Sequence, residues 1–279
     1  MHLFNEVSNH CSRITTKRYS TSFSSAINLL NKEQRKPIYN IYGFVRFADE
    51  IVDTFLIYNK RELLSEFKIE TYKAIERGIS LNPILHSFQE TVNEYQIDLK
   101  LVESFFKSME WDLNKKTYDT ESYNEYIYGS AEVVGLMCLF IFCEKDIEKY
   151  EQLKGYAQSL GAAFQKVNFL RDVKSDFQQL ERNYFPQADF SNFTRKMKID
   201  IEQEISEDFK NAYKGILLLP VKARFGVYVA YKYYLSLFKK IKRAKAAEIL
   251  EERIRIPNYS KVFIVMRASV KNQLKLIKA

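Results

Sequence analysis

Residues 165–176 read QKVNFLRDVKSD and lie inside the longest segment that we predict to be one helix, residues 147–180. On a helix, positions four apart lie on the same face, one turn above each other. Asn168, Asp172 and Asp176 therefore share a face of this helix. Stacked carboxylates repel one another, so a helix that keeps them usually offers them to a cation. The stretch thus predicts a long helix that carries a cation site.

A second acidic pair with the same spacing stands in the first half of the chain. Residues 46–53 read RFADEIVD, so Asp49 and Asp53 also share a helix face. About four acidic pairs at this spacing are expected by chance among 35 acidic residues, which makes one pair alone a weak signal. Both pairs, however, are surrounded by apolar residues, where unpaired carboxylates are costly. Together they favour a functional site over two solvated surface faces.

The oxygen ligands of these two faces indicate which cation and which substrate group would bind. Mg²⁺ prefers oxygen ligands and usually takes one or two carboxylates together with the phosphates of a substrate. Two aspartate faces that look at each other would therefore bind Mg²⁺, or Mn²⁺ in its place, and hold a diphosphate. Arg46 and Arg171 are placed beside these faces to bind phosphate oxygens, although an ion pair with the acids of its own helix is the alternative for Arg171. Two further polar candidates near the second face are Gln165 and Asn168.

The composition predicts one all-α domain over residues 1–279. Hydrophobic residues make up 46% of the chain, and only 8 Gly and 5 Pro interrupt it, which favours long helices with few breaks. The 19 Tyr and 21 Phe indicate either ordinary helix packing or an apolar cavity whose rings stabilise positive charge. Candidates for the lining of such a cavity are Phe23, Tyr42, Phe44, Tyr126 and Phe164.

The predicted helices follow from apolar periodicity and from the breaks between segments. Pro37 suits the first turn of one helix, and Asn82-Pro83 separates two others. We find no linker, repeat or shift in composition that would mark a domain boundary. The expected helices cover residues 4–19, 20–31 (a short helix or a turn), 36–58, 60–77, 84–95, 98–113, 119–143, 147–180, 196–218, 220–243, 244–252 and 260–277, with an ordered loop over 182–189.

A net charge of +8 suggests an anionic partner: a diphosphate, an acidic membrane surface or nucleic acid. The densest basic run, residues 239–243, is predicted to be a solvated helix face, so we expect no nucleic acid. Three cysteines without metal-ligand spacing, and no signal-peptide pattern, indicate a reducing cytoplasm.

Two apolar segments bear on membranes. The run over residues 133–143 is shorter than the about 20 residues that span a bilayer, so we predict a buried helix. Residues 261–278 mix apolar and basic side chains. We predict a core helix with one wet face there, and peripheral contact with the inner face of the membrane is the alternative.

The sequence lacks the motifs of several other kinds of active site. The three histidines make no metal-ligand pair at helical spacing, and no Glu-x-x-His motif occurs. No nucleotide-type glycine loop and no Gly-x-Ser-x-Gly turn is present.

Five motifs, in order from about residue 10 to residue 260, resemble the squalene/phytoene synthase family, and most closely its bacterial phytoene synthases. The set is specific, because ordinary helical proteins would not carry all five. The motifs are residues 16–24 (TKRYSTSFS), Arg46-x-x-Asp49-x-x-x-Asp53, residues 126–135 (YIYGSAEVVG), Gln165-x-x-Asn168-x-x-Arg171-Asp172-x-x-x-Asp176 and Arg182-x-Tyr184-Phe185-Pro186. Glu132 departs from the family, which usually has a small residue there, and it would either reshape the cavity or face away from it.

The resemblance implies an isoprenoid-synthase-type helical bundle around a central apolar cavity. It also implies a Mg²⁺-dependent head-to-head prenyltransferase, which joins two prenyl diphosphates through a cyclopropylcarbinyl diphosphate into a linear polyene. Because the chain shows no membrane anchor and no nicotinamide site, we expect a reaction without NADPH. The predicted product is phytoene from two geranylgeranyl diphosphates, in carotenoid biosynthesis. A C30 dehydrosqualene from farnesyl diphosphate is the alternative.

The resemblance also implies roles for individual residues. Ser20 and Ser22 would approach a diphosphate, and Tyr126 or Tyr128 would assist the second ionisation or the removal of a proton. The implied metal ligands are Asp49, Asp53, Asn168, Asp172 and Asp176. The implied substrate-binding residues are Ser20, Ser22, Phe23, Arg46, Gln165, Asn168 and Arg171.

Two rival functions remain. A non-catalytic helical scaffold on a membrane or RNA would tolerate losing the aspartates and would gather its basic residues on one surface. In this chain all four aspartates are present and the basic residues are dispersed along the sequence. A head-to-tail prenyl elongase would carry two Asp-Asp-rich motifs, which this chain lacks.

Overall fold

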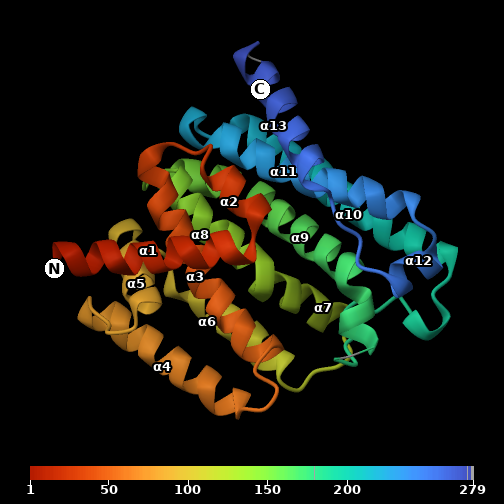
Figure 1. The fold of residues 1–279 in the computed structure, drawn as a ribbon, viewed down its shortest axis with the longest axis horizontal. Helices are drawn as coiled ribbons and strands as arrows, with labels where there is room; N and C mark the ends of the chain where they lie inside the picture. The colour runs from red at the N-terminus through yellow and green to blue at the C-terminus, as the bar shows by residue number, and fades with distance from the viewer. Residues whose placement is uncertain (179, 275, 278–279) are drawn as a thin grey trace.

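The computed structural model describes residues 1–178, 180–274 and 276–277, and within them the chain is helical and contains no strand (Figure 1). The all-α prediction is therefore confirmed. The helices are α1 (His2–Tyr19), α2 (Thr21–Ile27), α3 (Lys32–Asp53), α4 (Lys60–Arg77), α5 (Pro83–Tyr95), α6 (Leu99–Asp112), α7 (Thr120–Ile127), η1 (Tyr128–Glu132), α8 (Val133–Phe142), α9 (Ile147–Gln178), η2 (Phe190–Asn192), α10 (Arg195–Leu218), α11 (Val221–Arg243), α12 (Ala246–Glu251) and α13 (Asn258–Gln273).

Helix α3 differs from its prediction at both ends. It begins at Lys32 instead of residue 36, because the Asn31 side chain accepts the backbone N–H of Glu33 and caps the first turn. It ends at Asp53 instead of residue 58, where the Lys60 ammonium donates to the carbonyl of Val52 at 2.8 Å. The first acidic pair therefore lies in the last two turns of α3, at the open end of the helix.

The predicted helix over residues 119–143 is one continuous stretch with a π-helical turn, η1, in its middle. Gly129 lies in this turn, where an added Cβ would come within 2.5 Å of the carbonyl oxygen of Ser104 on α6. Among the described residues, only the stretch Thr120–Phe142 is long and apolar enough to cross a membrane by length and composition. Most of its apolar window, 61%, is buried inside the protein, as in the core helices that pass the same test.

An aromatic cluster fixes α3 against α4, α5 and α6. Phe44 is fully buried and stacks on Phe88, with ring centroids 3.8 Å apart. The other members of the cluster are Phe67, Phe105 and Phe106. The prediction that Phe44 lines a cavity is therefore wrong. Its ring packs into the core on one side of α3, and the opposite side of the helix faces α9.

Helix α9 runs through the middle of the molecule, between α8 and α10 (Figure 1). The prediction placed its end at residue 180; the described helix reaches Gln178, residue 179 lies outside the described residues, and Leu180 is not helical. Helices α2, α3, α8, α10 and α11 surround it and enclose a cavity.

Helix α13 contradicts the prediction of a core helix. It packs along α11 and extends past the body of the protein (Figure 1). Its only fully buried side chain is Ala268. It begins at Asn258 and ends at Gln273, and residues 275, 278 and 279 of the segment lie outside the described residues.

Candidate active site

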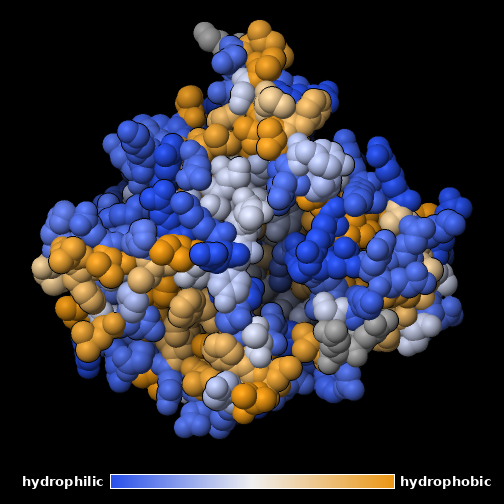
Figure 2. Space-filling model, viewed as in Figure 1, coloured by the Kyte–Doolittle hydropathy of each residue, from blue (hydrophilic) through white to orange (hydrophobic). Residues whose placement is uncertain are grey.

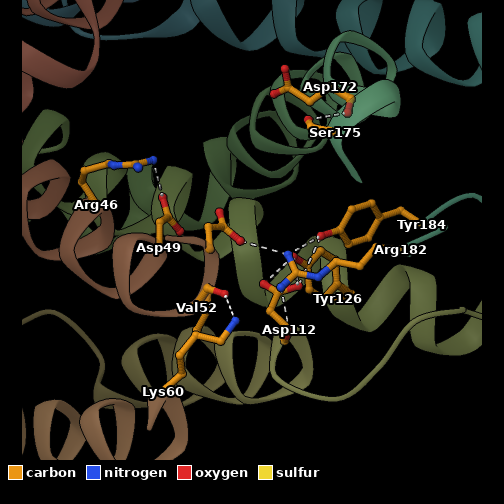
Figure 3. Close-up of polar contacts among 11 residues, drawn as sticks. Arg46, Asp49, Val52, Lys60, Asp112, Tyr126, Asp172, Ser175, Arg182 and Tyr184 are labelled. Atoms are coloured by element: carbon orange, nitrogen blue, oxygen red, sulfur yellow. Dashed lines mark hydrogen bonds and ion pairs between the residues drawn. The ribbon is translucent and has the colours of Figure 1, made fainter. Parts of the chain in front are cut away.

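One cavity of about 510 Å³ opens between α3 and α9 and combines two kinds of wall. Its inner part is lined by aliphatic and aromatic side chains, and its opening carries charged side chains that we call the charged rim. The charged rim consists of Asp49, Asp53, Asp112, Asp172, Asp176, Arg46, Arg171, Arg182 and Arg253. Figure 3 shows Asp49 and Asp172 on opposite sides of this opening, carried by different helices. The predicted arrangement of two facing aspartate surfaces is present.

The α3 side carries Asp49 and Asp53. Burial and the nearby carboxylate of Asp53 raise the pKa of Asp49 to about 7. Arg46 is held by its own helix, since its guanidinium pairs with Glu50 and lies 4.0 Å from the Asp49 carboxylate. The same guanidinium stacks over the ring of Tyr19 at 4.3 Å. Arg46 therefore stands beside the aspartates with its charge already oriented towards the opening.

The α9 side carries Asp172 and Asp176. Arg171 donates to the Asp172 carboxylate from Nε at 3.0 Å and from Nη2 at 2.5 Å, which is the ion pair within its own helix that we considered from the sequence. Arg253, from the segment after α12, places its Nε 2.6 Å from the same carboxylate. Burial, then the carboxylates of Asp172 and Asp53, raise the pKa of Asp176 to about 7. The contribution of Asp53 on α3 to the raised pKa of Asp176 on α9 is consistent with the two faces lying across one opening.

Two residues of the charged rim, Asp112 and Arg182, form a buried polar cluster with Tyr126 and Tyr184, and of these four only Asp112 was missed from the sequence. Tyr126 donates to both carboxylate oxygens of Asp112, at 2.9 and 2.7 Å, and the hydroxyl of Tyr184 is 3.3 Å from the same group. Arg182 donates from Nη2 to the carbonyl of Asp112 at 2.7 Å and from Nη1 to Asp53 at 2.9 Å (Figure 3). The cluster thus connects α3, α6 and the loop after α9.

Burial dominates the electrostatics of this cluster. It raises the pKa of Asp112 to about 7, although the Arg182 charge acts in the opposite direction. The pKa of Tyr126 is also raised well above its usual value, by burial and by the Asp112 carboxylate. A signal for Asp112 was available, because it continues the apolar stripe of α6 formed by Leu101, Phe105 and Met109 at helical spacing.

One of the two candidate tyrosines and one of the two candidate serines line the cavity. Tyr126 lines the cavity, whereas Tyr128 is not among the lining residues. Ser20 lines the opening and caps α2 by accepting the backbone N–H of Phe23 at 3.2 Å, whereas Ser22 is not among the lining residues.

An aromatic wall lies next to the α9 face. Phe164 stacks on Tyr234 with centroids 3.9 Å apart, and Phe23 packs against both rings. The hydroxyl of Tyr234 donates to Asn168 at 3.3 Å, and Gln165 donates to Ser130 at a similar distance. The lining candidates Phe23, Tyr42, Tyr126 and Phe164 all contribute to this cavity.

Glu132 does not enter the cavity. Its carboxylate accepts a hydrogen bond from Gln158 at 2.8 Å, and it is not among the lining residues. Burial raises its pKa, while Lys166 acts in the opposite direction. Of the two outcomes considered for this departure, the structure has the side chain turned away.

The carboxylates of the rim do not form a ready-made metal cage. No group of three or more His, Cys, Asp or Glu side chains converges closely enough to hold a metal ion among the described residues. The rim nevertheless has five carboxylates against four guanidiniums, and three of its aspartates, Asp49, Asp112 and Asp176, have a pKa of about 7. Such a donor set fits a hard divalent cation that brings phosphate oxygens with it, as Mg²⁺ does.

Comparison with known proteins agrees with this geometry. The profile of the family described as squalene/phytoene synthase matches residues 16–260. The 4,4'-diapophytoene synthase of Staphylococcus haemolyticus (strain JCSC1435) is 29% identical over 206 residues, covering 71% of this chain and 69% of that protein. The phytoene synthase of Arthrospira platensis is 24% identical over 287 residues, covering 94% and 92%. A crystal structure of a dehydrosqualene synthase in complex with ligand has the same fold, with a TM-score of 0.82 and 18% identity, covering 96% of this chain and 98% of that chain.

Proposed function

The chain belongs to the squalene/phytoene synthase family, and from this premise we propose that it condenses two geranylgeranyl diphosphates head to head into phytoene, in carotenoid biosynthesis. The observation that carries the proposal is a cavity that combines an apolar interior with two aspartate faces at its opening. A diphosphate fits the charged rim, and a prenyl chain fits the interior.

The reaction proceeds in two stages. One diphosphate leaves, the double bond of the second substrate captures the allylic cation, and loss of one proton from the resulting carbocation closes the ring of a cyclopropylcarbinyl diphosphate. The second diphosphate then leaves, and rearrangement with loss of one proton gives the linear polyene. Each polyene formed thus releases two diphosphates.

The charged rim binds the leaving group. Asp49 and Asp53 on α3, with Asp172 and Asp176 on α9, would hold Mg²⁺, or Mn²⁺, together with Asn168. When bound, the metal neutralises the charge that develops as diphosphate departs. The guanidiniums of the rim reach phosphate oxygens by exchanging their present carboxylate partners for the substrate.

The interior protects the carbocation. Phe23, Phe164 and Tyr234 offer ring faces that stabilise positive charge, in a cavity that the prenyl chains fill and keep dry. Tyr126, whose hydroxyl lies on the Asp112 carboxylate, is the residue that we assign to the second ionisation or to proton removal. Tyr128 is not among the residues that line the cavity, so we do not give it this role.

The depth of the cavity supports the longer substrate. Lining residues follow α9 from Asp172 down to Leu153, which is about 28 Å at 1.5 Å per residue. An isoprene unit adds four chain carbons, about 5 Å when extended at ordinary bond lengths. A geranylgeranyl chain of four units therefore needs about 20 Å, which this wall accommodates.

Farnesyl diphosphate is the second candidate, because its shorter chain fits the same wall and because the Staphylococcus haemolyticus relative is a diapophytoene synthase. Its product would be the C30 dehydrosqualene. The carboxylates, the arginines and the aromatic wall would act on it in the same way.

Product analysis tests the proposal. The purified protein is incubated with Mg²⁺ and either geranylgeranyl or farnesyl diphosphate, with and without NADPH, and the hydrocarbons are identified by mass. We expect a C40 polyene without NADPH and no change when NADPH is added. A C30 product alone would assign the second candidate, and no hydrocarbon from either donor would refute head-to-head condensation.

A further inference from the structure

Most of the net positive charge of the chain lies in its C-terminal segment. Residues 253–279 contain seven Lys and Arg and no Asp or Glu, in a chain whose net charge is +8. Helix α13 lies within this segment and presents Arg267 on its exposed surface. Most of the excess charge therefore belongs to one terminal segment.

An apolar stripe runs along the exposed side of α13, and Figure 2 shows apolar surface at the top of the molecule, over this helix. Its members recur at intervals of three and four residues and lie opposite Ala268, the side chain that the helix buries. Each of them is more than half exposed, which is unusual for so many large apolar side chains on one helix. The stripe consists of Tyr259, Val262, Phe263, Met266 and Val270, and Leu274 continues it past the end of the helix.

The segment is also tied to the opening of the cavity. Arg253, which precedes α13, pairs with Asp172 of the charged rim. Lys261, in the first turn of α13, donates to the Thr21 hydroxyl at 2.7 Å, and Thr21 directly follows Ser20 of the opening. The apolar stripe therefore starts beside the entrance to the cavity.

We propose that the apolar stripe of α13 inserts into the interface of an anionic lipid bilayer and holds the opening of the cavity near the membrane. An amphipathic helix with one apolar face and flanking basic residues binds such an interface through buried apolar area and attraction to acidic headgroups. The absence of any acidic residue from the segment matches that partner. A second copy of the chain is disfavoured as occupant, because pairing the two stripes would bring two strongly basic segments together.

Docking at a bilayer also suits the proposed reaction, whose substrate and product are apolar, and this part of the inference rests on the proposed function. A C40 or C30 polyene is far more soluble in lipid than in water, and the prenyl chain of the substrate partitions in the same direction. A cavity that opens at the bilayer interface can take up substrate and release product without exposing them to water. The docking itself does not depend on which polyene is formed.

Vesicle binding of the full chain tests the docking without any substrate. The protein is sedimented with phosphatidylcholine vesicles, with or without about one third phosphatidylglycerol. We expect binding to the anionic vesicles that weakens as salt is raised. The variant Phe263→Gln/Met266→Gln should lower the partition coefficient at least about tenfold, and Arg267→Gln/Lys271→Gln should remove the preference for phosphatidylglycerol.

The matched control is Leu81→Gln/Ile147→Gln, which removes two exposed apolar side chains from other surfaces and should bind vesicles as the parent does. All variants should keep the parent rate on substrate dispersed in detergent, because none of these residues lines the cavity. Equal binding by the stripe variant and the parent would overturn the proposal. A lipid-free dimer that the stripe variant dissociates would also overturn it, in favour of a second copy of the chain.

Discussion

Replacing Arg182 by methionine should destabilise the protein strongly, because this arginine is the counter-charge of a buried carboxylate. The side chains of Arg182 and Asp112 are only 6% and 4% exposed, with 3.7 Å between Nη1 and Oδ1. Arg182 also donates to Asp53 and to the carbonyl of Asp112. Arg182→Met removes all these donors and leaves the Asp112 carboxylate buried without a cation.

The size of the effect follows from the burial. Removing one partner of a buried ion pair costs about 3–5 kcal/mol. For a chain of this length, each kcal/mol lowers the melting temperature by about 2–4 °C, so a fall of about 6–20 °C is expected. Arg253 is the matched control, because it also pairs with an aspartate but is half exposed, so Arg253→Met should cost no more than about 1 kcal/mol.

The stability lost in Arg182→Met should be larger at higher pH. The pKa of Asp112 in the folded protein, about 7, is above its ordinary value of 3.8, so the folded state holds this proton more tightly than the unfolded chain. The contribution of Asp112 to stability therefore falls as pH rises between about 4 and 7. Arg182 lowers this pKa, so in Arg182→Met the fall continues to higher pH.

Thermal unfolding at about pH 5 and about pH 8 measures both effects. The gap between parent and Arg182→Met should be larger at the higher pH, and Arg182→Met/Asp112→Asn should recover part of the stability at that pH. A difference in stability between parent and Arg182→Met of less than about 1 kcal/mol at the higher pH, or an equal difference at both pH values, would refute the reasoning.

Two other pairs of variants give direct tests. Gly129→Ala should lower the melting temperature, because the new Cβ would lie 2.5 Å from a carbonyl oxygen of α6. In Gly155→Ala the new Cβ meets nothing within 4 Å, so this variant should raise stability by about 0.5–1 kcal/mol. Equal melting temperatures of the two variants would contradict this. Tyr126→Phe should reduce kcat by at least about tenfold while Tyr128→Phe leaves it near the parent value, as measured by polyene formation; a larger loss in Tyr128→Phe would reverse the assignment.

Local spacing predicted the parts of the site that lie on a single helix. Asp49 and Asp53 on α3, and Asp172 and Asp176 on α9, line one opening, as the interval of four residues indicates. That the two helices face each other was supposed from the presence of two such pairs, because spacing within a helix does not fix how two helices pack. The aromatic wall was predicted in part, because periodicity tells which rings are buried but does not tell which side of α3 faces the cavity, as Phe44 illustrates.

The residues that were missed depend on contacts between distant segments. Asp112 has its partner Arg182 70 positions away, and nothing local to either residue reveals the pair. The ends of α3 were misjudged because a cap at Asn31 and a lysine donating to its last turn decide them. Helix α13 was predicted to be a core helix with one wet face because its apolar content was taken for core. Ile264, Val265 and Ala268 do pack inwards, whereas the larger part of its apolar side chains is exposed.

The central claim is that the two aspartate faces act together on the diphosphate. Diphosphate release with Mg²⁺ and geranylgeranyl diphosphate, measured for Asp49→Asn and Asp172→Asn, tests it most directly. Asp200→Asn, at an exposed position on α10, is the control. We expect each rim variant to lose at least about a hundredfold in rate. Asp49→Asn should also be at least about 1 kcal/mol more stable than the parent at about pH 8, because it removes a carboxylate that burial and Asp53 disfavour.

Turnover near the parent rate in either rim variant would contradict the claim, because one aspartate face alone would then suffice. A rate lost in all three variants, the control included, would equally contradict it.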